Sequence, residues 1–245
     1  MPLTAAQIVT LANQAAHTPG MTSQAGQKLN SILDELCKTY DIGSARLVFN
    51  FSFNIGPNGV NVGSGPYSLP TDYLRTQHGK QFYLYNGQPY FMTRIELWEY
   101  DALIQQAGFQ DFPRNFTVDT STSPPQEFVW PAPSISVPVT VRYYRQMPDI
   151  VTPETSAVVP WFTYTQYLIT RLTGEMMALA DDVRAADFLT DDEKQNPQGA
   201  GVLLRRYLNM KDDPEGRSKT VELDQRRFSC QAMWSKLPNT KSIGW

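Results

Sequence analysis

The chain has 245 residues, a formal net charge of −3 and a pI of about 5.4, a balance that disfavours a surface built to grip nucleic acid over its whole extent. A hydrophobic content of 41% excludes global disorder, and no apolar run is long enough to span a bilayer. Because Cys37 and Cys230 make neither a disulfide framework nor a zinc site, and Met1–Thr4 does not begin a secretory signal, we expect a soluble chain made in a reducing compartment.

Residues 1–44 are predicted to form a pair of helices. Thr4 and Gln7 have the spacing of a capping box, in which each side chain bonds to the backbone N–H of the other residue. Apolar residues then recur at helical intervals before Pro19-Gly20, at Ile8, Leu11, Ala12 and Ala15. A second helix begins near Thr22 or Ser23 and carries one apolar stripe: Ala25, Leu29, Ile32, Leu33, Leu36, Cys37 and Tyr40. The short turn between the helices predicts antiparallel neighbours.

Residues 45–151 are predicted to form an antiparallel β region with short helical insertions. Apolar residues alternate with polar ones in the first strand, at Leu47, Phe49, Phe51 and Phe53. Further strand candidates are Gln81–Tyr85, Pro89–Thr93, Phe116–Val118, Glu127–Trp130 and Ser134–Tyr144. Pro131, Pro133 and Pro138 place the last of these at an edge, because proline cannot donate to a central ladder.

Three connections interrupt this β region. Residues 54–66 are rich in glycine and proline and are predicted to be a loop or hairpin tip. Ile95–Ala107 is predicted to be a helical insertion that ends at Gly108, and Asp119–Pro125 a polar loop.

Helices return at 152–215. Pro160 suits a first-turn position, and an apolar stripe follows it: Trp161, Tyr164, Tyr167, Leu168, Leu172, Met176 and Leu179. Another helix is expected at about Ala200–Met210, and residues 216–245 are predicted to be an extended basic and aromatic tail. The fold class is therefore α+β: a helical bundle formed by N- and C-terminal helix pairs, a central antiparallel β region and an extended C-terminal tail.

The segment Tyr67–Arg75, with the sequence Tyr-Ser-Leu-Pro-Thr-Asp-Tyr-Leu-Arg, carries a recognisable motif. A proline at a turn followed by an aspartate as a cap predicts one helical turn, with the neighbouring Leu69, Tyr73 and Leu74 in the core. The segment resembles the aromatic-x-Leu-Pro-x-Asp-(Tyr/Phe)-Leu-Arg segment common in phage head-to-tail connector proteins. The residues that match it are Tyr67, Leu69, Pro70, Asp72, Tyr73, Leu74 and Arg75.

The order of elements extends this resemblance. The strand Val139–Arg145 precedes Met147-Pro148-Asp149 and a helix that opens Val159-Pro160-Trp161. This plan is similar, over roughly Thr4 to Met210, to that of the tail tubular protein A family. That family forms the adaptor ring under the portal of short-tailed phages.

The resemblance implies a structural virion protein and not an enzyme. It implies a homo-oligomeric ring of twelve copies that docks on the portal protein and holds the tail nozzle protein. DNA would pass through its channel without specific binding, with no membrane and no cofactor involved. The expected location is the neck or tail of the virion, after assembly in the host cytoplasm. Residues 54–66, 95–125 and those beyond 216 have no counterpart in the compact members, so their roles stay open.

The tail contains the candidate partner interface. It combines cations with large apolar anchors, a composition favoured at binding hot spots: Arg226, Arg227, Phe228, Met233, Trp234 and Trp245. As a hypothesis, it clamps the portal or a neighbouring subunit, because a segment that orders on contact covers much surface. The alternative is that the tail folds back on its own domain.

No catalytic, cofactor-binding or metal-binding residue is predicted. His17 and His78 are the only imidazoles, and both are expected to be surface or capping residues. The acidic runs Asp181-Asp182 and Asp191–Glu193 are expected at solvated helix ends.

Two other functions stay open from the residues alone. A tail-associated enzyme that degrades cell walls needs two nearby carboxylates, and Glu96 and Glu99 beside Trp98 are candidates by composition. A carbohydrate- or receptor-binding β module would show exposed aromatic residues lining a groove.

Overall fold

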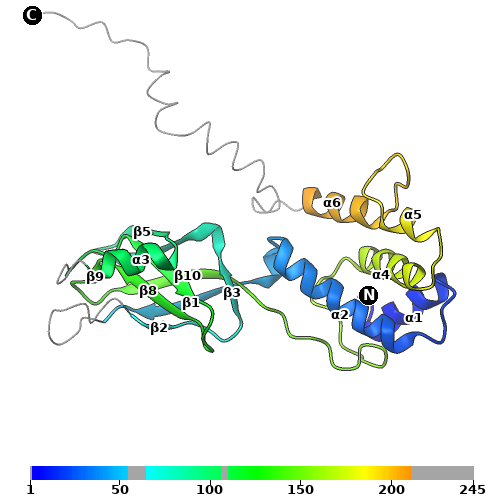
Figure 1. Cartoon of the computed structure of the whole chain (residues 1–245), viewed down its shortest axis with the longest axis horizontal. Helices are drawn as coiled ribbons and strands as arrows, with labels where there is room; N and C mark the ends of the chain where they lie inside the picture. Colours follow the sequence, from blue (N-terminus) through cyan, green and yellow to red (C-terminus); the bar gives the residue numbers. More distant parts are fainter. Residues whose placement is uncertain (1, 55–64, 106–109, 211–245) are drawn as a thin grey trace, which may run out of the picture. The chain divides into compact units, whose positions relative to one another are not determined.

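A computed structural model of the chain describes residues 2–54, 65–105 and 110–210 (Figure 1). The chain divides into two compact units. The helical unit consists of the described residues 2–43 and 149–210, and the β unit of the described residues between 44 and 148. The predicted α+β fold class is confirmed, whereas the predicted tail at 216–245 and most of the loop at 54–66 lie outside the described residues.

The helical unit is built from α1 (Ala5–Ala15), α2 (Thr22–Thr39), α4 (Thr165–Leu179), α5 (Ala185–Leu189) and α6 (Ala200–Met210). The predicted capping box of α1 is confirmed: Thr4 Oγ1 accepts a 3.3 Å bond from the Gln7 N–H, and Gln7 Oε1 accepts a 2.9 Å bond from the Thr4 N–H. The first turn is also satisfied from far along the chain, because the Ala5 N–H donates to the Val158 carbonyl oxygen at 2.8 Å.

The buried face of α1 differs from the predicted one. Leu11 is 41% exposed and Ala15 is exposed, whereas Val9 is buried. The buried positions are Ala5, Ile8, Val9, Ala12 and Asn13, followed by Ala16 at the C-cap. Both stripes have helical spacing, and the packing of α1 against α2 and α4 selects the second.

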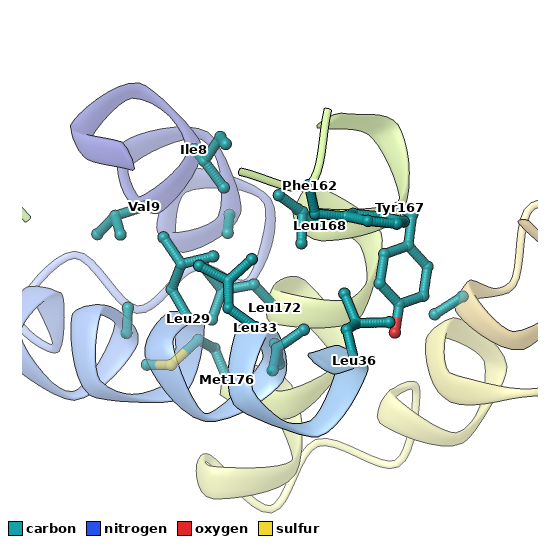
Figure 2. Packing of buried hydrophobic residues seen from close by; sticks show 14 of the residues in the cluster. Ile8, Val9, Leu29, Leu33, Leu36, Phe162, Tyr167, Leu168, Leu172 and Met176 are labelled. Atoms are coloured by element: carbon teal, nitrogen blue, oxygen red, sulfur yellow. The ribbon is translucent and has the colours of Figure 1, made fainter. Parts of the chain in front are cut away.

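Helix α4 contacts all four other helices of the helical unit. Leu168, Leu172 and Met176, spaced one turn apart, have no exposed surface. Figure 2 shows Leu172 beside Leu29 and Leu33 of α2. Gly174 lets α5 approach α4 closely, because a Cβ at this position would lie 2.7 Å from Leu189 Cδ2.

The β unit has one eight-stranded sheet among its described residues. Its strands are β1 (Arg46–Ser52), β2 (Tyr67–Ser68), β3 (Tyr73–Thr76), β4 (Lys80–Tyr85), β5 (Gln88–Arg94), β7 (Asn115–Asp119), β8 (Gln126–Trp130) and β10 (Pro138–Arg145). The order is β1-β10-β4-β5-β7-β8-β2, with β3 pairing β10. A second pair joins β6 (Gln110–Asp111) to β9 (Ala132–Pro133).

The sheet is mixed, which corrects the predicted antiparallel β region. Strands β5 and β7 pair in parallel, as do β6 and β9. The helix α3 (Leu97–Ile104) lies between β5 and β7 in the sequence. A tight turn reverses the chain between strands, whereas a longer connection through a helix allows the next strand to run in the same direction.

Strand β10 is central, which corrects its predicted edge position. It pairs with β1 on one side and with β3 and β4 on the other. The prolines are compatible with this place because Pro131 and Pro133 precede the strand and Pro138 is its first residue.

The chain passes between the two units at neighbouring positions. Arg46 at the start of β1 pairs with Tyr144 near the end of β10, so both connections leave the same end of the strand pair. Where the chain re-enters the helical unit after β10, the side chain of Asn30 on α2 binds the backbone of Ile150. Its Nδ2 donates to the Ile150 carbonyl oxygen at 3.0 Å, and its Oδ1 accepts from the Ile150 N–H at 3.1 Å.

Candidate functional site

The Leu-Pro-Thr-Asp segment is a turn into a strand, not the helical turn predicted for it. The Tyr73 N–H donates to the Pro70 carbonyl oxygen at 3.0 Å, which closes a β-turn, and β3 begins at Tyr73. The Leu69 N–H donates to the Pro125 carbonyl oxygen at 2.9 Å. Before the turn the chain pairs with β8, and after it the chain pairs with β10 as β3. A helical turn at this place could not form these strand pairings.

Asp72 joins this turn to β10. Its Oδ1 accepts a 3.0 Å bond from the Tyr143 hydroxyl, and its carbonyl oxygen accepts a 2.7 Å bond from the Gln146 N–H. The rings of Tyr73 and Tyr143 stack with their centroids 5.6 Å apart. Burial, assisted by the Asp72 carboxylate, raises the pKa of Tyr143 to about 12, so its hydroxyl stays a donor at neutral pH.

The other motif residues also contact the sheet. Leu69 and Tyr73 are buried and Leu74 is half-buried. The Arg75 guanidinium lies 4.8 Å from the centroid of the Tyr144 ring. The Tyr67 ring contacts those of Phe51 and Phe53, at centroid distances of 5.2 and 5.3 Å. The motif residues therefore contact the sheet of their own β unit and stabilise its fold.

Replacing Asp72 with alanine should lower the free energy of unfolding of the β unit by about 1 to 3 kcal/mol, because the buried Tyr143 hydroxyl loses its acceptor. Urea unfolding of Asp72→Ala, Tyr143→Phe and the double variant measures the coupling. The exposed Asp101→Ala change on α3 is the matched control. Additive effects of the two single changes would contradict the interaction.

Glu96 and Glu99, the candidates for an enzymatic carboxylate pair, form the cap of α3. The Glu96 side chain accepts from the backbone N–H of Glu99, and Glu99 Oε2 accepts from the Glu96 N–H at 3.0 Å. Trp98 between them is 71% exposed. Both carboxylates therefore have a structural partner in the first turn of the helix.

The remaining reactive side chains have ordinary surroundings. His17 and His78 are exposed, with left-handed backbone at φ 56° and 53°. Cys37 is buried on α2, as predicted. In the part of the chain that the structure describes, no group of three or more His, Cys, Asp or Glu side chains is placed to hold a metal ion. No helix in the same residues is long and apolar enough to cross a membrane.

The two acidic runs form ion pairs. Asp182 accepts from the guanidinium of Arg184, with the shortest bond at 2.6 Å, and this bond lowers the pKa of the carboxyl to about 2. Glu193 pairs with Arg206 of α6, and Asp191 Oδ2 lies 3.6 Å from Arg205 Nη2.

Most aromatic side chains of the β unit lie in its core, which disfavours a sugar-binding groove. Phe53, Tyr83, Phe116 and Tyr143 are all buried. Among its described residues, the exposed aromatic ones are Trp98 at 71%, Phe91 at 67% and Tyr90 at 41%.

A buried polar pair, Gln81 and Glu127, was not predicted. Gln81 Nε2 donates to Glu127 Oε2 at 3.0 Å, and the glutamate has no exposed surface. Burial raises the pKa of Glu127 to about 8, so the carboxyl is mostly protonated at neutral pH. A signal existed in the sequence, because Glu127 shares its face of β8 with Val129, two residues on.

The candidate partner-interface residues Arg226, Arg227, Phe228, Met233, Trp234 and Trp245 lie outside the described residues. The proposed role of these residues therefore depends on the sequence alone.

Comparison with known proteins identifies a family. A protein-family model described as SU10 adaptor protein matches residues 4–224, a range that covers the β unit and nearly all described residues of the helical unit. A search of curated proteins found no match to the chain.

Proposed function

The chain belongs to the SU10 adaptor protein family, which makes it a structural adaptor protein of bacteriophages located in the neck of the virion, and from this premise we propose how it works there. Twelve copies form a ring that docks under the portal protein and holds the tail nozzle protein. The ring leaves a central channel for the genome, and assembly takes place in the host cytoplasm. The observation that carries the proposal is the family match, which covers nearly all of the described chain.

The division of the chain into two units suits a ring subunit. A ring that closes by rotation needs two different, complementary faces on each copy. A helical unit made from both ends of the sequence and a β unit inserted between them provide surfaces of different composition. The net charge of −3 suits a DNA channel as well, because basic walls would hold phosphate.

Native mass spectrometry of the purified chain, alone and mixed with its portal ring, tests the proposal. A stoichiometric ring on the portal is the expected result, and its mass gives the number of copies. A persistent monomer that ignores the portal would overturn the adaptor ring.

Deleting residues 226–245 should abolish docking on the portal, because we propose that the cationic and aromatic residues of this segment clamp the portal or the neighbouring copy. The same native mass measurement checks this result. Circular dichroism and the urea midpoint of the truncated chain serve as the control, and both should match those of the full chain. Docking that survives the deletion would show that the clamp lies elsewhere.

A further inference from the structure

The sheet of the β unit has one face turned away from its core, and several large apolar side chains on this face are exposed. In strands β1, β10, β4 and β5, alternate residues point away from the buried core. The register places these outward residues side by side: Val48 beside Arg142, Thr140 beside Phe82, and Phe82 beside Phe91. We call the surface formed by Val48, Phe82, Leu84, Phe91, Thr140 and Arg142 the outer face.

The outer face exposes large apolar side chains. Phe91 is 67% exposed, Val48 56% and Leu84 44%. The rings of Phe82 and Phe91 are 6.1 Å apart, which joins β4 to β5 in one apolar surface. Apolar side chains gathered in this way on a soluble unit mark an interaction site more often than single exposed ones do.

The charge on the outer face is positive. The exposed Arg142 places its guanidinium 5.9 Å from the centroid of the Phe82 ring. The outward positions of the same four strands, all within the described residues, hold no aspartate or glutamate. An occupant of this face should therefore combine apolar side chains with carboxylates.

The helical unit of the same chain combines exposed apolar side chains with carboxylates. Its described residues carry more carboxylates than cationic side chains. Its most exposed large apolar residue is Val183, at 91%, in the corner between α4 and α5. Asp181 precedes it and is exposed, and the exposed Asp187 follows in α5. We call residues 179–187 the acidic corner.

Hydrogen bonds connect the acidic corner to the end of α4 and within itself. Asp181 has left-handed backbone at φ 55°, a conformation that aspartate adopts more readily than most residues other than glycine. The Asp182 N–H donates to the Met177 carbonyl oxygen at 2.9 Å, and the Asp182 carboxylate binds Arg184. These bonds fix the backbone on both sides of Val183.

We propose that the acidic corner of one copy docks on the outer face of the β unit of the next copy in the ring. Val183 packs against Phe91, and the carboxylate of Asp181 lies near Arg142. The contact joins two different surfaces, which is the type of interface that closes into a ring. This inference rests on the proposed ring, and it names the two surfaces that build it.

A protein surface fits the outer face better than single-stranded nucleic acid does. Arginine and aromatic rings also bind nucleic acid, but the bases need flat rings to stack on. Val48 and Leu84 are aliphatic and contribute nothing to stacking, whereas they pack well against another protein.

Disulfide trapping between copies tests the contact. Full-length chains carrying Phe91→Cys are mixed with chains carrying Val183→Cys, both with Cys230→Ser, and oxidised on the portal ring. A disulfide requires Cα atoms within roughly 7 Å, so a direct contact is needed. We expect the mixed pair to cross-link at least about tenfold more than Phe91→Cys mixed with Val151→Cys, because docking raises the effective concentration of the pair. Val151 is a matched control, since it lies in the helical unit and is 83% exposed.

Each outcome separates this contact from the proposed function. The proposed contact is supported if Phe91→Cys cross-links to Val183→Cys but not to Val151→Cys, in a ring of normal mass. A ring of normal mass without such dimers overturns the contact and leaves the adaptor ring standing. Phe91→Cys that cross-links to the portal protein instead would assign the outer face to that partner. Loss of binding to single-stranded DNA in Arg142→Glu, with an intact ring, would assign the face to nucleic acid and overturn the contact.

Discussion

Replacing Leu172 with alanine is expected to lower the free energy of unfolding of the helical unit by about 3 to 5 kcal/mol. Leu172 has no exposed surface and lies between α4 and α2, beside Leu29 and Leu33 (Figure 2). Truncation removes buried methyl groups and leaves a cavity that surrounding helices fill only in part. Because single domains are stable by roughly 5 to 15 kcal/mol, the change removes a large part of the total.

Hydrogen-exchange mass spectrometry on peptides from α1, α2 and α4 measures this effect in the full chain, where two units need not unfold together. Leu179→Ala is the matched control, since Leu179 ends the same helix and is 47% exposed. Its effect should stay within about 0.5 kcal/mol. Equal effects of the two substitutions would show that α4 does not have its buried face where we place it.

The β unit should lose stability as the pH rises from about 5 to 8.5, and Glu127→Gln should remove this loss. Burial raises the pKa of Glu127 from 4.5 to about 8, although the hydrogen bond from Gln81 acts in the opposite direction. Between these values the folded state holds a proton that the unfolded state has released. The contribution of Glu127 to the free energy of unfolding is therefore fully present below the pKa of the unfolded state. It is lost as the pH rises through the pKa of the folded state. With one pKa unit worth about 1.4 kcal/mol, the loss is about 3 to 6 kcal/mol.

The glutamine variant keeps the shape of the pair and carries no charge. Its amide can accept from Gln81 Nε2 as the acid does, and its NH2 group can donate to Gln81 Oε1. Exchange of β4 and β8 amides, corrected for the intrinsic rate at each pH, gives the stability of both proteins. Glu99→Gln on α3, outside the buried pair, is the matched control for the substitution itself. A wild-type β unit equally stable at pH 5.5 and 8.5 would contradict a neutral, buried Glu127.

The segment Tyr67–Arg75, which carried the resemblance to phage connector proteins, also stabilises the β unit. The resemblance predicted an adaptor of phage heads and tails, and the family match confirms that part of the prediction. The structure places the same residues in the turn that leads into β3 and against β10. Asp72 therefore has a structural role within the β unit.

Local sequence signals determined the individual elements of this protein. The capping box of Thr4 and Gln7, the stripe of α2 and the alternation in β1 each depend on residues within a few positions of one another. Backbone hydrogen bonds and side-chain spacing act over the same short range, so these elements were predictable.

Only the tertiary structure decided which elements became neighbours. The bond between Asp72 and Tyr143 spans 71 positions, and the one between Gln81 and Glu127 spans 46. The central place of β10 and the parallel pairing of β5 with β7 likewise depend on which strands meet. Alternating residues show that a strand has two faces, but the partner on each face sets which one is covered. For this reason the exposed Phe91 and the partner of Glu127, Gln81, became visible only in the folded chain.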